Sequence, residues 1–204
     1  MKKQILSFVA LIILCVSGSV SFAQSHFYKN AYKFRNSGAY DKETALLSVA
    51  YGVLDFQHGF KEKDFKADGN LGPFYAQLEK AVMEELGIGF KMAAGFTYGD
   101  YHGLNHFNTT NLALGVHAIY HFNKFIPWEF LDVYAGAGAG VRYNILSFER
   151  NIVDDGKDEI KVFPEAFVGV RYYFIPQLGV FVQGGYDGFS SLQAGLTFRL
   201  YSNN

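Results

Sequence analysis

The feature that most constrains the fold of this chain is an alternation of side-chain character with a period of two residues. It recurs in eight runs of the 204-residue sequence: residues 44–56, 73–82, 86–98, 111–122, 131–144, 162–174, 179–186 and 192–201. A period of two is typical of β-strands, because successive side chains point to opposite faces. No helical period of useful length competes with it, so the sequence predicts an all-β fold.

The two faces of these strands differ sharply in composition. One face is continuously apolar, whereas the other mixes glycine with isolated charges, as where Phe90 and Met92 flank Lys91. Rows of glycine weaken a strand that faces water, but the interior of a narrow eight-stranded barrel needs small residues beside large ones. We therefore expect the glycine-rich face to line a lumen and the apolar face to point outward.

The cations of the glycine-rich face indicate what surrounds the barrel. Lys91, Arg142, Arg171 and Arg199 all share that face. Turned toward lipid, each would cost about 2–4 kcal/mol at mid-membrane, and the sum is comparable with the roughly 5–15 kcal/mol that stabilises a domain. Lys80, on the apolar face, lies close enough to a strand end to reach the membrane interface. A closed barrel is the one way in which strands can cross a bilayer.

The connections between the runs alternate in length. Residues 83–85, 123–130 and 175–178 are tight or moderate connections, whereas 57–72, 99–110 and 145–161 are longer and polar; the connection 187–191 is short. Turns at one rim and loops at the other are typical of an up-and-down membrane barrel. Aromatic residues near the two rims predict the girdles of such a barrel: Tyr120, Phe122, Trp128, Phe130, Tyr172, Phe174, Phe198 and Tyr201 at one, and Tyr51, Phe74, Phe96, Tyr98, Tyr143 and Tyr186 at the other.

Residues 1–23 have the pattern of a cleaved secretory signal, with Lys2 and Lys3 before an apolar run and small residues at its end. The run of about a dozen apolar residues is shorter than the roughly 20 that a membrane-spanning helix needs. The single cysteine, Cys15, lies in this run, so no disulfide or cysteine metal site is expected in the mature chain. Residues 24–43 are predicted to be a periplasmic segment and residues 44–204 the barrel. The net charge of −1 provides no basic excess for nucleic acid.

The last run carries the most local resemblance to a known family. Residues 193–200 read QAGLTFRL, which places Gln193, Gly195, Phe198 and Leu200 at the polar, glycine, aromatic and apolar positions of a C-terminal assembly signal. With the eight-run pattern, the chain resembles the small eight-stranded outer-membrane β-barrels of Gram-negative bacteria, the OmpA/OmpX type, although residues 201–204 extend past the usual end. The resemblance implies insertion by the outer-membrane assembly machinery, contact with outer-membrane lipid and lipopolysaccharide, termini in the periplasm and long loops outside the cell.

The inward face also carries the candidate functional residues. The expected lumen polar network is Glu79, Lys91, Asp132, Arg142, Glu165, Arg171, Gln183 and Arg199. Its mixed charges predict a salt-bridged plug, because eight strands leave almost no bore; a conductive polar pathway is the alternative. His117 and His121, about 13 Å apart along one strand, are expected to form lumen hydrogen bonds. A surface metal site at His102, His106 and Asp100 remains an open alternative.

These patterns predict a non-catalytic outer-membrane barrel, structural or surface-binding, with no cofactor and no catalytic or metal residues. Residues 57–72 and 145–161 are where contact with an extracellular ligand or protein is expected. The alternatives are a narrow-pore or gated transport protein, a lipid A-modifying barrel enzyme and a soluble lipocalin-like binder. The enzyme would need a serine beside a histidine with a supporting carboxylate, and no histidine here is followed two positions later by serine.

Overall fold

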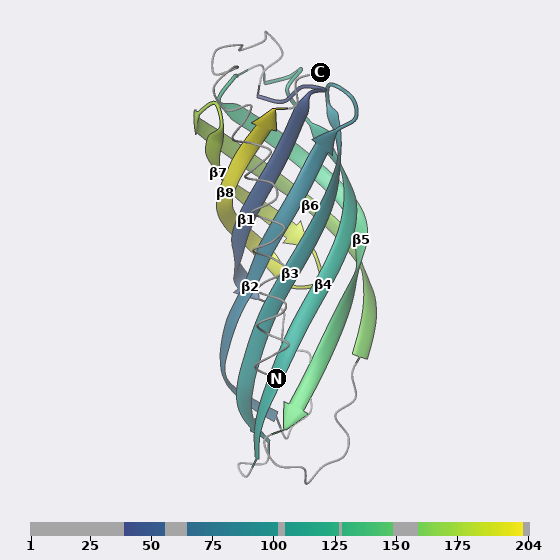
Figure 1. The fold of residues 1–204 in the computed structure, drawn as a ribbon, viewed down its shortest axis with the longest axis vertical. Helices are drawn as coiled ribbons and strands as arrows, with labels where there is room; N and C mark the ends of the chain where they lie inside the picture. The colour runs from purple at the N-terminus through teal and green to yellow at the C-terminus, as the bar shows by residue number, and fades with distance from the viewer. Residues whose placement is uncertain (1–38, 56–64, 102–104, 127, 149–158, 202–204) are drawn as a thin grey trace.

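A computed structural model describes residues 39–55, 65–101, 105–126, 128–148 and 159–201. They form a closed barrel of eight antiparallel strands in sequence order, with β1 closing against β8 (Figure 1). The strands are β1 (Thr44–Asp55), β2 (Phe65–Ala81), β3 (Leu86–Tyr101), β4 (Asn105–His121), β5 (Leu131–Phe148), β6 (Glu159–Ile175), β7 (Leu178–Tyr186) and β8 (Ser190–Tyr201). The predicted eight-stranded, up-and-down transmembrane barrel is confirmed. Within the described ranges, no helix has the length and apolarity needed to cross a membrane.

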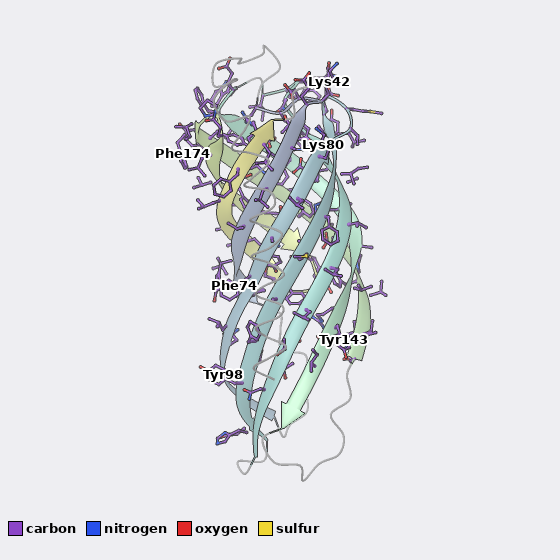
Figure 2. The ribbon with its side chains drawn as sticks, viewed as in Figure 1. Lys42, Phe74, Lys80, Tyr98, Tyr143 and Phe174 are labelled. Carbon is purple, nitrogen blue, oxygen red and sulfur yellow. The ribbon has the colours of Figure 1, made fainter. Side chains whose placement is uncertain are left out.

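The pleat of the strands separates an apolar outer wall from a packed interior. On β4, Val116 is 59 % exposed while its neighbour His117 is 4 % exposed. A slip of one residue in register would exchange these two environments along a whole strand, so the register is strongly specified. Exposed aromatic side chains lie toward both ends of the wall: Tyr51, Phe74, Tyr98, Tyr143 and Tyr186 toward one, and Tyr120, Trp128, Phe130, Tyr172 and Phe174 toward the other. Figure 2 shows Phe174 and Lys80 at the end with the short turns, far from Tyr98 and Tyr143.

Several strands are longer than the sequence pattern predicts. Residues 65–72, 99–101, 105–110, 145–148 and 159–161 were expected in loops but continue the strands. That expectation was wrong because a polar composition does not end the backbone pairing between neighbouring strands. In the structure Thr97 still pairs with Thr109, and Tyr101 with Asn105. Backbone pairing does not require an apolar face, so the strands continue through polar residues.

Only five of the eight strands, β2 to β6, continue beyond the closed part of the barrel. β6 pairs with β7 from Ala166 onward, and β2 pairs with β1 only as far as Phe74. Residues 65–73 and 159–165 therefore form the two outer edges of a five-stranded sheet, β2 to β6, which we call the extension (Figure 1, lower end). Pro73 and Pro164 stand next to the points where β2 and β6 lose a neighbour. Proline cannot donate to a ladder and is confined to such edges.

Glycines of the wall make room for large side chains inside the lumen. A Cβ atom at Gly169 on β6 would lie 2.3 Å from Cζ of Tyr134, and one at Gly89 on β3 would lie 2.1 Å from Nε2 of His117. Each ring thus lies directly over the backbone of a neighbouring strand. Small and large residues alternate across the lumen in the way that a narrow barrel requires.

We predict that Gly169→Ala destabilises the barrel, because the new methyl group overlaps the fully buried Tyr134 ring. The expected loss is about 1–3 kcal/mol in the free energy of unfolding, measured by urea titration of Trp128 fluorescence in lipid vesicles. Gly184→Ala is the matched control, because its Cβ would approach no atom closer than 3.8 Å. Equal stability of the two variants would contradict this account of the glycines.

Candidate functional site: the plugged lumen

Four ionisable side chains form a closed ring inside the barrel near its short-turn end. Arg171 on β6 donates from Nη2 to Glu79 Oε2 at 2.7 Å and from Nη1 to Asp132 Oδ2 at 3.0 Å. His121 on β4 lies between the same two carboxylates, with Nε2 2.8 Å from Glu79 Oε1 and Nδ1 2.8 Å from Asp132 Oδ1. All four are buried. We call these four residues the inner ring. They come from β2, β4, β5 and β6, and both carboxylates have hydrogen-bond partners across the lumen.

A segment of chain ahead of β1 covers the inner ring. Tyr40 stacks on His121 with ring centroids 3.4 Å apart and planes inclined by 9°. Arg199 donates to the carbonyl oxygen of Ala39 at 2.6 Å, and Asn123 donates to that of Tyr40 at 2.9 Å. Burial, with the nearby Glu79 charge, raises the pKa of the Tyr40 hydroxyl, so the ring that closes this end is uncharged.

A second network lies toward the other end of the lumen. Lys91 Nζ is 2.6 Å from Glu165 Oε1 and 3.0 Å from Asp187 Oδ2, and His117 Nδ1 is 3.1 Å from Glu165 Oε2. Gln193 donates to Asp187 Oδ2 at 2.5 Å. We call these five residues the outer network. Ile119, Tyr134 and Phe167 form an apolar cluster within the same lumen.

The connection between β7 and β8 turns into the barrel and closes it at the end opposite the inner ring. Asp187 Oδ1 accepts the backbone N–H groups of Phe189 and Ser190 at 2.9 Å and 2.8 Å, and Gly188 has a φ of +76°, which favours glycine. Phe189 is fully buried in a cluster with Tyr75, Ala93, Ala113 and Phe163. Arg142 donates to the carbonyl oxygen of Gly188 at 2.6 Å. The short loop is therefore a plug held by side chains of the wall.

The structure places all eight residues of the expected polar network on the lumen side. Seven are buried and Arg142 is half-buried. They do not form one network: Glu79, Asp132 and Arg171 belong to the inner ring, Lys91 and Glu165 to the outer network. Gln183 accepts from the Tyr134 hydroxyl at 3.2 Å, and Arg199 lies over the Tyr173 ring, 3.9 Å from its centroid.

Three participants were missed by sequence reasoning. Tyr40 and Asp187 lie outside the alternating runs, so no pattern marked their side chains as inward. Gln193 was expected only as part of the assembly signal, yet its position on the inward face of the last run could have indicated its place in the outer network. Of the other signal residues, Phe198 and Leu200 lie on the opposite face of β8 from Gln193 and Gly195. Their recognition by assembly machinery stays a prediction.

The possible surface metal site is only partly described. His106 Nδ1 lies 2.5 Å from Asp100 Oδ1, whereas His102 falls outside the described residues. Within the described part of the chain, no group of three or more His, Cys, Asp or Glu side chains is arranged to hold a metal ion. The described pair alone is an exposed ion pair or hydrogen bond.

We predict that Arg171→Met strongly destabilises the barrel, because it leaves two buried carboxylates without their cation. The expected loss is about 3–5 kcal/mol in the free energy of unfolding, measured by urea titration in vesicles. Lys161→Met on the same strand is the control: its pair with Glu159 is exposed, and such pairs contribute about 0–1 kcal/mol. Similar losses in both variants would contradict a stabilising role for the inner ring.

Comparison with known proteins agrees with this architecture. No family model matches the chain, and no curated protein matches its sequence. Among solved structures, the outer membrane protein OprG from Pseudomonas aeruginosa has a TM-score of 0.52 and 11 % identity, covering 82 % of this chain and 100 % of its own. The Yersinia pestis protein Ail gives 0.46 and 13 %, covering 76 % and 93 %. The N-terminal β-barrel domain of P. aeruginosa OprF gives 0.40 and 17 %, covering 78 % and 98 %. The chain thus has the fold of the small eight-stranded outer-membrane β-barrels.

Proposed function

We propose that this protein is a non-catalytic outer-membrane barrel that does not conduct and that binds a ligand or partner at its extracellular end. The observation that carries the proposal is the closure of the lumen by chain segments at both ends. Tyr40 covers the inner ring, and Phe189 is buried at the opposite end with Asp187 anchored in the outer network. A transport pathway would have to displace both segments.

The pairing of lumen charges also disfavours the narrow-pore alternative. An open polar pathway needs charged groups that can exchange partners with passing ions and water. Here Lys91 contacts two carboxylates and Arg171 contacts two more, all of them buried. Removing a cation from such a pair leaves uncompensated buried charge, so the arrangement resists opening.

Polar groups of the extension support a binding role. Thr97, Thr109, Asn111 and Asn144 line its inner face and are buried. Within the described residues, the Thr97 and Thr109 hydroxyls and Asn144 Oδ1 have no hydrogen-bond partner. Buried groups of this kind cost about 1–3 kcal/mol each when unsatisfied, so water or a bound ligand is expected against them. Residues 57–64 and 149–158 of the expected contact loops lie outside the described part.

Hydroxyl groups inside the barrel support the non-catalytic role. The Ser48 hydroxyl donates to Thr197 Oγ1 at 2.9 Å, and Ser190 Oγ lies 2.8 Å from the Tyr75 hydroxyl. Both serines therefore bond to other hydroxyls rather than to a histidine. The lumen histidines bond to carboxylates that also face a cation, an arrangement suited to holding charge in place.

The proposal includes export behind a cleaved leader, residues 1–23, and insertion by the outer-membrane assembly machinery through the signal at Gln193, Gly195, Phe198 and Leu200. It is tested by fractionating cells and comparing gel mobility with and without boiling in detergent. Recovery in the outer membrane with a mobility shift is the expected result. Recovery as a soluble periplasmic protein without a shift would overturn the proposal and favour the lipocalin-like binder.

We predict that the reconstituted barrel gives no stable single-channel currents in planar lipid bilayers, because both ends of the lumen are closed. Phe189→Ala combined with Tyr40→Ala should increase current fluctuations by removing both buried rings. A general porin in the same bilayer serves as the control for channel insertion. Steady, reproducible conductance steps from the unaltered protein would favour the narrow-pore alternative.

A further inference from the structure

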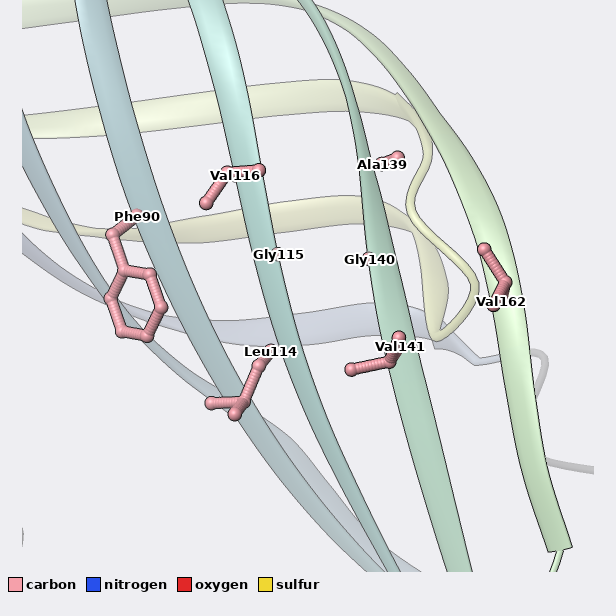
Figure 3. A pocket seen from close by; sticks show the side chains of 8 residues that line it. All are labelled: Phe90, Leu114, Gly115, Val116, Ala139, Gly140, Val141 and Val162. Carbon is pink, nitrogen blue, oxygen red and sulfur yellow. The ribbon is translucent and has the colours of Figure 1, made fainter.

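A cation without a counter-charge lies at the foot of the extension. Figure 3 shows Val141 on the outer wall, so the pleat turns the next residue of β5, Arg142, toward the lumen. Its Nη1 donates to the carbonyl oxygen of Gly188 at 2.6 Å, whereas its Nε has no hydrogen-bond partner within the described residues. Lys91 and Arg171 each contact two carboxylates, but no carboxylate of the described part forms an ion pair with Arg142.

Three oxygen atoms without hydrogen-bond partners lie on the same inner face, farther along the extension. Asn144 follows Arg142 by two residues on β5, and its Oδ1 is one of them. The other two are the hydroxyls of Thr97 and Thr109, which pair across β3 and β4. All three residues are more than nine-tenths buried. Buried polar groups are normally hydrogen-bonded, so these atoms and Arg142 point to a ligand.

The chemistry of the four groups specifies what that ligand carries. A guanidinium offers two parallel N–H donors along an edge, which match the two oxygens of a carboxylate. Because Nη1 of Arg142 is engaged by Gly188, the edge at Nε is the one that remains. An amide oxygen such as that of Asn144 only accepts, and a threonine hydroxyl both donates and accepts. A carboxylate for the cation and hydroxyls for the oxygens describe a sugar acid.

The charge of the inner face matches a single carboxylate. Lys161 and Glu159 on β6 lie opposite Arg142 and Asn144 in the register. They pair with each other at 2.8 Å, so together they add no net charge. One unpaired cation therefore balances one carboxylate. A phosphate ester, with a charge of about −1.5 to −2 at pH 7, would leave part of its charge uncompensated.

We propose that the inner face of the extension binds a sugar acid of at least disaccharide size, with its carboxylate on Arg142 and its hydroxyls along Asn144 and the two threonines. The inference deepens the proposed function and rests on it. Arg142 lies opposite Ala113 on β4. Thr109 is four residues from Ala113, which corresponds to about 13 Å along a strand. This span is longer than one sugar ring.

The test is isothermal titration calorimetry of the folded barrel in detergent with lactobionate, and with lactose as a disaccharide that has no carboxylate. We expect the unaltered protein to bind lactobionate about tenfold more tightly than lactose, which corresponds to about 1.4 kcal/mol. In Arg142→Gln, whose amide can still donate to Gly188, the two affinities should become equal. Lys161→Gln is the matched control, because it removes an inner-face cation that is already paired, and the preference should persist.

A second variant keeps the inference testable if Arg142→Gln loosens the connection between β7 and β8. Asn144→Asp preserves the shape of the side chain and places a carboxylate beside Arg142. Lactobionate affinity should then fall at least tenfold, whereas lactose affinity should change less than twofold because the aspartate oxygen still accepts. Every variant must first show the mobility shift of a folded barrel.

Four results would overturn the inference. They are no binding of lactobionate, equal affinities for lactose and lactobionate in the unaltered protein, the same loss in Lys161→Gln as in Arg142→Gln, or acetate binding as tightly as lactobionate. Failure of the proposed function is distinguishable, because it would appear as loss of outer-membrane fractionation in the unaltered protein.

The source of the sugar acid is identified by a further titration with tetragalacturonate. Tighter binding of this oligomer than of lactobionate would indicate the end of an acidic polysaccharide, and the reverse order a free sugar acid. Both orders support the inference, provided that Arg142→Gln weakens the tighter of the two.

Discussion

The pairing of Arg171 with Glu79 and Asp132 is the interaction on which most of this structure depends. A guanidinium enclosed by a lipid-facing wall has no water to solvate it, so it is tolerated only with partners of opposite charge and good geometry. Those partners come from β2 and β5, and His121 on β4 bonds to both of them. Arg171 and His121 together link four strands across the lumen through these two carboxylates, and the His121 ring is the surface on which Tyr40 stacks.

The lumen is filled by contributions of two different kinds. Side chains of the wall form the inner ring, the apolar cluster of Ile119, Tyr134 and Phe167, and most of the outer network. The ends are closed instead by backbone segments that enter the barrel, residues 39–40 at one end and 187–189 at the other. Each segment brings one buried aromatic ring, and each has carbonyl oxygens that accept from an arginine of the wall. Arg199 and Arg142 thus hold the two plugs, whereas Arg171 and Lys91 neutralise the buried carboxylates.

The sequence predicted the strands, whose alternation repeats along the chain. It did not predict the segments at Tyr40 and Asp187, which have no repeating pattern. Alternation along β3, β4 and β5 was enough to place Lys91, His117 and Asp132 inside, because a pleat leaves no choice once one face is assigned. Partner choice was not predictable, since Lys91 meets Glu165 only through the register of β3, β4, β5 and β6. Tyr40 and Asp187 act from outside the periodic runs. The extension was missed because polarity in Asn108 and Thr110 ends an apolar pattern without ending backbone pairing.

The edges of the extension have a consequence for how copies of this chain meet one another. Among the described strands, residues 159–165 of β6 have a neighbour on one side only, and an exposed edge of this kind invites a strand from another molecule to join it. Pro164 has no backbone N–H and so interrupts the row of N–H donors along this edge. Pro73 does the same on the edge of β2, where that edge meets the closed barrel. An edge strand with an interrupted row of N–H donors is a poor template for pairing with a strand of another molecule. Copies of the chain can therefore meet without joining edge to edge into a larger sheet. The two prolines therefore protect the open edges of the extension from pairing with another strand.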